Sequence, residues 1–197
     1  MSCWSITAVK SLASCKTRLA AHLSQQRRTA LATDMLSHVL SVLRRAEGVD
    51  RVAVVSPEHP VLPASVVALA DPGGGLNEAL SAAALEARHR GAERVLIVHA
   101  DLPLLEAEEV TALIDASRAS GVAIAPDRHG RGTNALCLAW PPAIRFEFGP
   151  DSLARHLAQA AARGLSPAVM RLPGLAFDLD DPDDLHCWAG LSEEVMS

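Results

Sequence analysis

The sequence lacks the cysteine pairs, long apolar runs and basic excess that mark several common classes of protein. Its four cysteines stand far apart and none forms a Cys-x-x-Cys pair. This disfavours a zinc site and a redox motif, so we expect reduced cysteines with structural roles. The stretch before Lys10 is too short and too weakly hydrophobic for a signal peptide, and no run approaches the length of a membrane span. We therefore expect a cytoplasmic protein without a membrane partner.

The charge balance restricts the kinds of partner. The formal net charge is -5, which leaves no broad basic surface, so we do not expect a nucleic acid partner. Positive groups must then be concentrated where an anionic ligand binds. No repeat and no linker divides the 197 residues, so we expect a single domain over 1–197. The sequence leaves open whether the chain forms a homo-oligomer.

Predicted strands and helices alternate along the chain. This order predicts an α/β fold, a three-layer α/β/α sandwich around a mostly parallel sheet, with ligand sites at the carboxyl ends of the strands. It stays open whether residues 126–173 form a small lobe. The expected strands are 6–9, 51–55, 66–70, 94–98, 122–125, 135–139 and 168–172, and the expected helices are 24–46, 76–90, 106–120 and 152–163.

Three aspartates follow or alternate with apolar residues and predict a divalent metal site. Asp101 comes soon after the aliphatic run 95–98 and is followed by Leu-Pro. Asp178 and Asp180 alternate with apolar residues near the C-terminus, so strand alternation predicts that both point to the same face. Carboxylate oxygens are the ligands that Mg²⁺ prefers, usually together with water and substrate phosphates.

Each of these acids also has a simpler explanation. Asp101 could cap a turn. Residues 181–184 have the pattern of a helix start with acids in its first turn, an interpretation that we adopt for Asp183 and Asp184. For Asp178 and Asp180 we favour metal binding, because two acids on one face of a strand repel each other unless a cation lies between them.

Several loops between predicted strands and helices have the composition of anion or nucleotide sites. The loop 10–19 carries three cations, which suits a polyphosphate, although a solvated basic loop would have the same composition. The loops 127–134 and 148–152 combine glycines with hydroxyls and can hold a small anion, while Asp151 or Ser152 could simply cap a helix.

The glycine loop 71–77 fits neither familiar phosphate-binding fingerprint, because no Lys-Ser/Thr follows it and its spacing is not Gly-x-Gly-x-x-Gly. Its backbone can still approach a ligand closely. We predict a nucleoside contact, with Asn77 hydrogen-bonding the base or ribose. A plain turn before a helix is the alternative.

The order of these motifs resembles the phospholactate/phosphoenolpyruvate guanylyltransferase family over nearly the whole chain. The resemblance implies the nucleotide-diphospho-sugar transferase fold. It also implies transfer of GMP from GTP to phosphoenolpyruvate, 2-phospho-L-lactate or 3-phospho-D-glycerate, with release of pyrophosphate, in biosynthesis of the deazaflavin coenzyme F-420. The motifs are Lys-x-Arg-Leu, Pro-Gly-Gly-Gly-Leu-Asn, Ala-Asp-Leu-Pro-Leu-Leu, Gly-Thr-Asn-Ala-Leu, Phe-Gly-Pro-x-Ser and Asp-Leu-Asp.

The resemblance also implies roles for individual residues. The basic loop and Asp101 would act in catalysis, and no general base would be needed, because the attacking phosphate is already ionised. The implied contacts are Lys10, Lys16 and Arg18 with the triphosphate; Asp101, Asp178 and Asp180 with Mg²⁺; Thr133, Gly149 and Ser152 with the acid; and Gly73, Gly74, Gly75 and Asn77 with guanine and ribose.

The chain departs from the family at His99, where members often carry proline or a small residue, and we favour a structural role for it. Two other functions stay open. One is a related nucleotidyltransferase acting on molybdopterin or a sugar phosphate, although residues 10–13 are not the Leu-x-Gly-Gly signature common there. The other is a non-catalytic nucleotide-binding module, against which the retained acids and cations argue.

Overall fold

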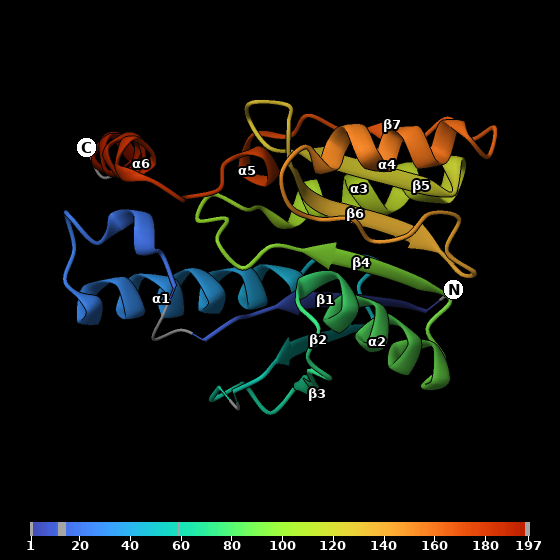
Figure 1. Ribbon diagram of the computed structural model, residues 1–197, viewed down its shortest axis with the longest axis horizontal. Helices are drawn as coiled ribbons and strands as arrows, with labels where there is room; N and C mark the ends of the chain where they lie inside the picture. Colours follow the sequence, from blue (N-terminus) through green and yellow to red (C-terminus); the bar gives the residue numbers. More distant parts are fainter. Residues whose placement is uncertain (1, 12–14, 59, 196–197) are drawn as a thin grey trace.

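The computed structural model describes residues 2–11, 15–58 and 60–195 (Figure 1). Part of the predicted basic loop, residues 12–14, therefore lies outside the described residues. The strands are β1 (Cys3–Ala8), β2 (Arg51–Ser56), β3 (Val66–Ala70), β4 (Arg94–Val98), β5 (Val122–Pro126), β6 (Thr133–Ala139) and β7 (Ala168–Val169). The helices are η2 (Thr17–Leu19), α1 (Gln25–Leu43), α2 (Leu76–His89), α3 (Ala107–Ser120), α4 (Ser152–Ala161), α5 (Pro173–Ala176) and α6 (Pro182–Val195).

The seven strands form one sheet in the order β3-β2-β1-β4-β6-β5-β7. All neighbours are parallel except β6, which runs antiparallel to both β4 and β5. The chain passes outward from β1 through β2 and β3 and then returns to β4 on the other side of β1. In such sheets this reversal opens a crevice at the carboxyl ends of the two central strands.

Apolar side chains cover both faces of the sheet. Leu36 and Val39 of α1 join Leu113 of α3 in the core on one face. Leu80 of α2 and Leu153 of α4 belong to the core on the other face. Burial of these apolar faces is the main favourable contribution to folding. The predicted three-layer α/β/α sandwich with a mostly parallel sheet is confirmed.

Local sequence signals account for the ends of several helices. Ser24 caps α1 by accepting a hydrogen bond from the backbone N–H of Arg27. Gly121 follows α3 with a φ of 78°, a left-handed conformation that favours glycine. Asp183 and Asp184 lie in the first turn of α6, as predicted. None of the described helices is both long enough and apolar enough to cross a membrane.

The C-terminal third differs most from the expected elements. The strand expected at 168–172 has only two residues and is followed by the short helix α5, which the sequence analysis does not predict. Residues 177–180 belong to no strand, and Leu179 donates one backbone hydrogen bond to the carbonyl of Asp101. Burial still alternates over 177–180, where Phe177 and Leu179 are buried and Asp178 and Asp180 are partly exposed. Residues 177–180 therefore do not form a strand, but the expected alternation of Asp178 and Asp180 with buried residues is confirmed.

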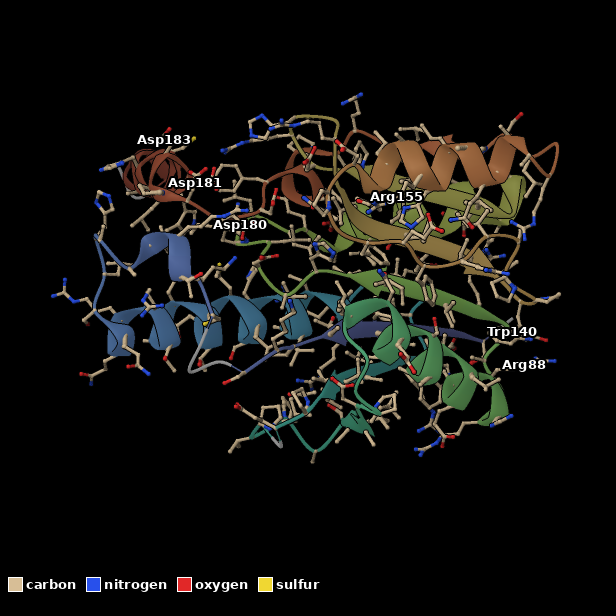
Figure 2. All side chains as sticks on the ribbon, in the orientation of Figure 1. Arg88, Trp140, Arg155, Asp180, Asp181 and Asp183 are labelled. Atoms are coloured by element: carbon tan, nitrogen blue, oxygen red, sulfur yellow. The ribbon has the colours of Figure 1, made fainter. Side chains whose placement is uncertain are left out.

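A small apolar cluster anchors this segment. Phe177 and Leu179 pack with Leu19 of η2 and Met35 of α1, and Trp188 of α6 lies against them. Figure 1 shows α6 beyond the end of the sheet, above the segment that precedes α1. Figure 2 shows Asp180, Asp181 and Asp183 in succession where the chain enters α6. The cluster thus carries the acidic segment to the edge of the sheet where β1 and β4 end.

The start of α5 is tightly packed, and we expect Gly174→Ala to destabilise the fold. An added Cβ at Gly174 would collide with the carbonyl oxygen of Leu104. The backbone N–H of Gly174 also bonds the carboxylate of Glu109 at 2.8 Å. Overpacking of this kind should lower the free energy of unfolding by about 1–3 kcal/mol in urea denaturation. Gly190→Ala in α6, where the added Cβ meets open space, should leave stability unchanged or raise it by about 0.5–1 kcal/mol.

Candidate active site

The site lies where the carboxyl ends of β1 and β4 meet. These strands are parallel neighbours, with Lys10 following the first and Asp101 following the second. Because β2 lies on the other side of β1, the connections leave this edge open. The structure therefore places Asp101 where the sequence predicts it, beyond a buried strand and beside the crevice.

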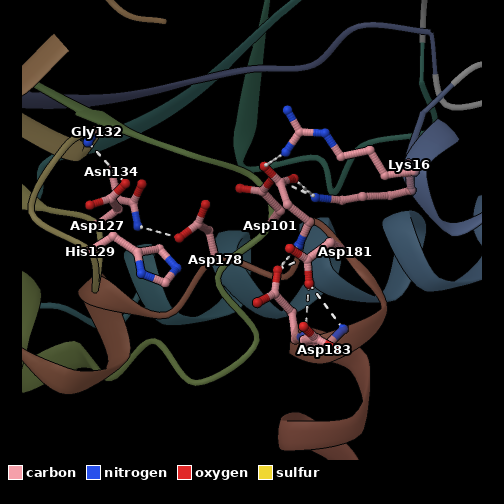
Figure 3. Close-up of polar contacts among 12 residues, drawn as sticks. Lys16, Asp101, Asp127, His129, Gly132, Asn134, Asp178, Asp181 and Asp183 are labelled. Carbon is pink, nitrogen blue, oxygen red and sulfur yellow. Dashed lines mark hydrogen bonds and ion pairs between the residues drawn. The ribbon is translucent and has the colours of Figure 1, made fainter. Parts of the chain in front are cut away.

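A lysine joins two of the three predicted metal ligands. Nζ of Lys16 lies 2.5 Å from Oδ2 of Asp101 (Figure 3). It also lies 2.8 Å from Oδ1 of Asp180. Nη1 of Arg18 lies 3.7 Å from the other oxygen of Asp180. The Lys16 side chain is only 8% exposed, so salt screens these contacts weakly. The basic loop and the acids, which are separate motifs in the sequence, form one charged cluster.

Burial and charge act in opposite directions on this cluster. Burial by itself would lower the pKa of Lys16, but the charges of Asp101 and Asp180 outweigh it and raise that pKa. Burial would raise the pKa of Asp101, but the charges of Lys16 and His99 and the hydrogen bond from Lys16 lower it. Lys16 and Asp101 are therefore both charged near neutral pH.

Asp178 is held by an amide instead. Nδ2 of Asn134 lies 3.1 Å from Oδ1 of Asp178 (Figure 3) and also reaches two backbone carbonyls of α5. Burial raises the pKa of Asp178, the hydrogen bond from Asn134 opposes this, and the charges of Asp101 and Asp180 raise it further. Asp178 thus lies in a place where an added cation would favour its charged form.

The donor chemistry of the three acids fits a divalent cation. Oδ1 of Asp101 is buried and has no hydrogen-bond partner among the described residues. In the part of the chain that the structure describes, no three His, Cys, Asp or Glu side chains gather closely enough to hold a metal ion by themselves. Mg²⁺ commonly takes only one or two protein carboxylates and completes its shell with water and phosphates. Its binding by Asp101, Asp178 and Asp180 stays a prediction.

Two cavities meet at the charged cluster, and both are of the size that binds small molecules. The first, about 480 Å³, extends between α1 and α2, and we call it the apolar cavity. The second, about 590 Å³, lies among the β5–β6 loop and the start of α4, and we call it the polar cavity. The residues that line both are Lys10, Arg18, His99, Asp101 and Asp180. His99 therefore borders both cavities, although we favoured a structural role for it.

The glycines of the loop 71–77 lie outside the lining of the apolar cavity. Leu76 and Leu80 of α2 line the apolar cavity, whereas the glycines at 73–75 and Asn77 are not among the described residues that line it. The Asn77 amide instead holds the backbone of Phe148, accepting from its N–H at 2.7 Å and donating to its carbonyl at 3.1 Å. Asn77 thus ties α2 to the segment beside the polar cavity, and its contact with a nucleotide stays a prediction.

The three residues predicted to contact the acid come together. Thr133, Gly149 and Ser152 all line the polar cavity, with Arg131 nearby. Gly149 has a φ of 120°, which favours glycine at this position. Ser152 is the first residue of α4, where the positive end of the helix dipole attracts an anion. The end of the polar cavity at Ser152 and Arg131 is therefore suited to a small anionic ligand.

His156 escaped the sequence analysis, and Asp127 and Asn134, at the ends of the predicted loop 127–134, were given no individual role. His156 is fully buried beneath the polar cavity, Asn134 holds an aspartate, and Asp127 accepts two backbone N–H groups of its own loop. His156 follows Ser152 by four residues, so the two share one face of α4. That spacing was the available signal, but a lone histidine on an alanine-rich helix did not stand out.

The chain has the nucleotide-diphospho-sugar transferase fold. A structure from Desulfovibrio desulfuricans G20, described as such a transferase, has a TM-score of 0.78 and 20% identity over 95% of this chain and 87% of its own. A 4-diphosphocytidyl-2C-methyl-D-erythritol synthase has a TM-score of 0.63 and 17% identity over 96% and 97% of the two chains. At these identities the likeness establishes the fold.

Sequence similarity establishes the family. The protein-family model described as "Guanylyl transferase CofC like" matches residues 3–188. Phosphoenolpyruvate guanylyltransferase of Sphaerobacter thermophilus is 47% identical over 189 residues, 94% of this chain and 91% of that protein. That of Conexibacter woesei is 40% identical over 192 residues, covering 94% and 86%. The chain belongs to the CofC-like guanylyltransferase family and is a nucleotidyltransferase, which confirms the resemblance seen in the motif order.

We expect Asn77→Ala to lower the free energy of unfolding by about 1–3 kcal/mol, because the partly buried N–H and carbonyl of Phe148 would lose their partners. Urea denaturation followed by circular dichroism measures this. Ser81→Ala, at an exposed position on the same helix, should change stability by less than about 0.5 kcal/mol. Equal stability of the Asn77 variant and the wild type would contradict the proposed link between α2 and Phe148.

Acidification should destabilise the protein through His156. Burial, with a contribution from the charge of Arg155, lowers the pKa of this residue to about 4. The unfolded chain therefore binds a proton near pH 6.5, before the folded protein does, and stability is lost as the pH falls toward 4. Between pH 7 and 5 the wild type should lose about 2 kcal/mol more than His156→Gln in urea denaturation. Parallel losses in the two proteins would contradict this pKa.

Proposed function

We propose that this guanylyltransferase transfers GMP from GTP to a small phosphorylated carboxylic acid and releases pyrophosphate, in biosynthesis of the deazaflavin coenzyme F-420. The candidate acids are phosphoenolpyruvate, 2-phospho-L-lactate and 3-phospho-D-glycerate, and the names of the relatives favour the first. The observation that carries the proposal is the charged cluster of Lys16, Asp101 and Asp180 at the boundary of two cavities. Such a boundary suits a reaction that joins two ligands.

The two cavities differ in chemistry, and this difference supports an assignment of the substrates. The apolar cavity would take the guanine and ribose against Leu76 and Leu80, and the basic loop at its mouth would face the triphosphate. The polar cavity would take the acid, whose charge suits Ser152 at the start of α4 and the nearby Arg131. The reacting phosphates would then meet at Asp101.

The reaction requires alignment rather than a protein nucleophile. A phosphate oxygen of the acid attacks the α-phosphorus of GTP, a new P–O bond forms, and the bond to the bridging oxygen of the β-phosphate breaks. Pyrophosphate departs with that electron pair, and no proton has to be removed from the attacking phosphate. Lys10 and Arg18 line both cavities, so they can stabilise negative charge on the leaving group.

Asp101, Asp178 and Asp180 would hold Mg²⁺. The unpartnered buried oxygen of Asp101 and the raised pKa of Asp178 support this assignment. A Mycobacterium tuberculosis protein of the same fold, 15% identical with a TM-score of 0.55, has been solved with manganese. When bound, Mg²⁺ neutralises the phosphates that face each other. Lys16, which contacts two of the acids, would supply further positive charge beside the phosphates.

Pyrophosphate release from GTP, Mg²⁺ and each acid in turn tests the proposal. One acid should support turnover, and Asp101→Asn and Asp178→Asn should each reduce it at least about 100-fold, because charge stabilisation at the reacting phosphates would be lost. Asp115→Asn, at an exposed residue of α3 paired with Arg118, should leave the rate unchanged. Folded protein that releases no pyrophosphate with any of the three acids would overturn the proposed substrates.

Replacing GTP by CTP in the same assay tests the nucleotide. Turnover with GTP alone supports the assignment, and faster turnover with CTP would overturn it.

Removal of the divalent cation with EDTA should abolish release, and added Mg²⁺ should restore it, because the phosphates would otherwise repel each other.

A further inference from the structure

His156 uses both of its ring nitrogens beneath the polar cavity. Its Nδ1 lies 3.1 Å from Oγ1 of Thr133, and its Nε2 lies 3.0 Å from the backbone nitrogen of Glu147. The side chain is fully buried. Its ring also packs edge-on against Phe148, with the ring centroids 5.2 Å apart. The ring is therefore fixed in position, and only its pattern of protons remains to be assigned.

The backbone contact decides which nitrogen carries the proton. A backbone N–H can only donate, so Nε2 of His156 must accept the hydrogen bond from Glu147 and carries no proton. Burial lowers the pKa of the ring to about 4, so the ring is neutral near pH 7. A neutral imidazole carries one N–H, which must then be on Nδ1. This N–H donates to the hydroxyl oxygen of Thr133.

The direction of this hydrogen bond determines what the Thr133 hydroxyl can do. Since its oxygen accepts from His156, its own hydrogen is available for a second bond. Among the described residues, the ring of His156 is its one hydrogen-bond partner. Thr133 lines the polar cavity together with Ser152 and Gly149. The threonine is thus prepared to donate to an acceptor in the cavity.

We propose that His156 is a positioning residue that holds the Thr133 hydroxyl as a hydrogen-bond donor to an anionic oxygen of the acid substrate. The inference rests on the proposed function and adds a residue to its acid site. An ionised phosphate or carboxylate oxygen only accepts hydrogen bonds, so a hydroxyl with its hydrogen committed elsewhere would bind it poorly. His156 therefore acts on the acid through Thr133 and not on the nucleotide.

Two amide variants separate this role from simple structural support. The short side chain in His156→Asn places an N–H near the position of Nδ1, whereas the longer one in His156→Gln places a carbonyl near the position of Nε2. His156→Asn should therefore keep the bond to Thr133, and His156→Gln should keep only the bond to Glu147. We expect His156→Gln to raise the KM for the acid about tenfold, and His156→Asn to stay within about threefold of the wild type. The KM for GTP should change less than about twofold in both.

The test is which of the two variants has the higher KM for the acid. If His156 merely supports the Glu147 segment, His156→Asn will be the more impaired protein, which would overturn the proposal. A double variant provides the second test. His156→Gln combined with Thr133→Val should be no worse than Thr133→Val alone, because both changes remove the same donor. If the two substitutions instead raise the KM for the acid by factors that multiply in the double variant, His156 acts independently of Thr133.

Two measurements without turnover distinguish this inference from the proposed function. Nitrogen-15 NMR of the histidine ring should show a proton on Nδ1 at pH 7, and a proton on Nε2 would overturn the inference. Calorimetric binding of phosphoenolpyruvate should weaken about tenfold in His156→Gln and about threefold or less in His156→Asn. If the three proteins bind the acid with these relative affinities but the wild type releases no pyrophosphate, the proposed reaction is wrong and the positioning role of His156 is supported. Equal binding by both variants would overturn the role.

Discussion

The site depends on one ammonium group placed between two carboxylates. Lys16 belongs to the loop after β1, Asp101 follows β4, and Asp180 lies near the C-terminus, yet Nζ of the lysine contacts both acids. Without a cation, the carboxylates of Asp101 and Asp180 would repel each other, and Asp101 has one oxygen buried away from water. The lysine satisfies both and joins three distant segments of the chain at the edge where β1 and β4 end.

Other parts of the fold serve to bring these segments together. The crossover from β3 to β4 opens the crevice, and the cluster of Phe177 and Leu179 against η2 and α1 directs the acidic segment toward it. Asn77 fastens the backbone of Phe148 to α2, and His156 bonds both Thr133 and the backbone of Glu147. The charged cluster thus lies between an apolar cavity supported by α1 and α2 and a polar cavity supported by α4.

The sequence was informative where local chemistry sets the structure. The aliphatic run before Asp101 identified a buried strand and a carboxylate at its end, and the alternation around Asp178 and Asp180 survived although no strand forms there. The features that the sequence analysis missed have a common origin. Neither the antiparallel direction of β6 nor the contact between Asn77 and Phe148 leaves a local pattern, because each depends on residues far apart in the chain.

The α/β class and the family follow from the sequence, which also supplies candidate residues for a nucleotide and an acid, because periodicity, turn residues and motif order are local properties. The spatial arrangement of these residues depends on the tertiary structure. That structure placed Lys16 between two of the predicted metal ligands and assigned Asn77 to the protein backbone. It also put His156 behind Thr133, since only packing at a distance determines which polar groups are buried and which partner satisfies each of them.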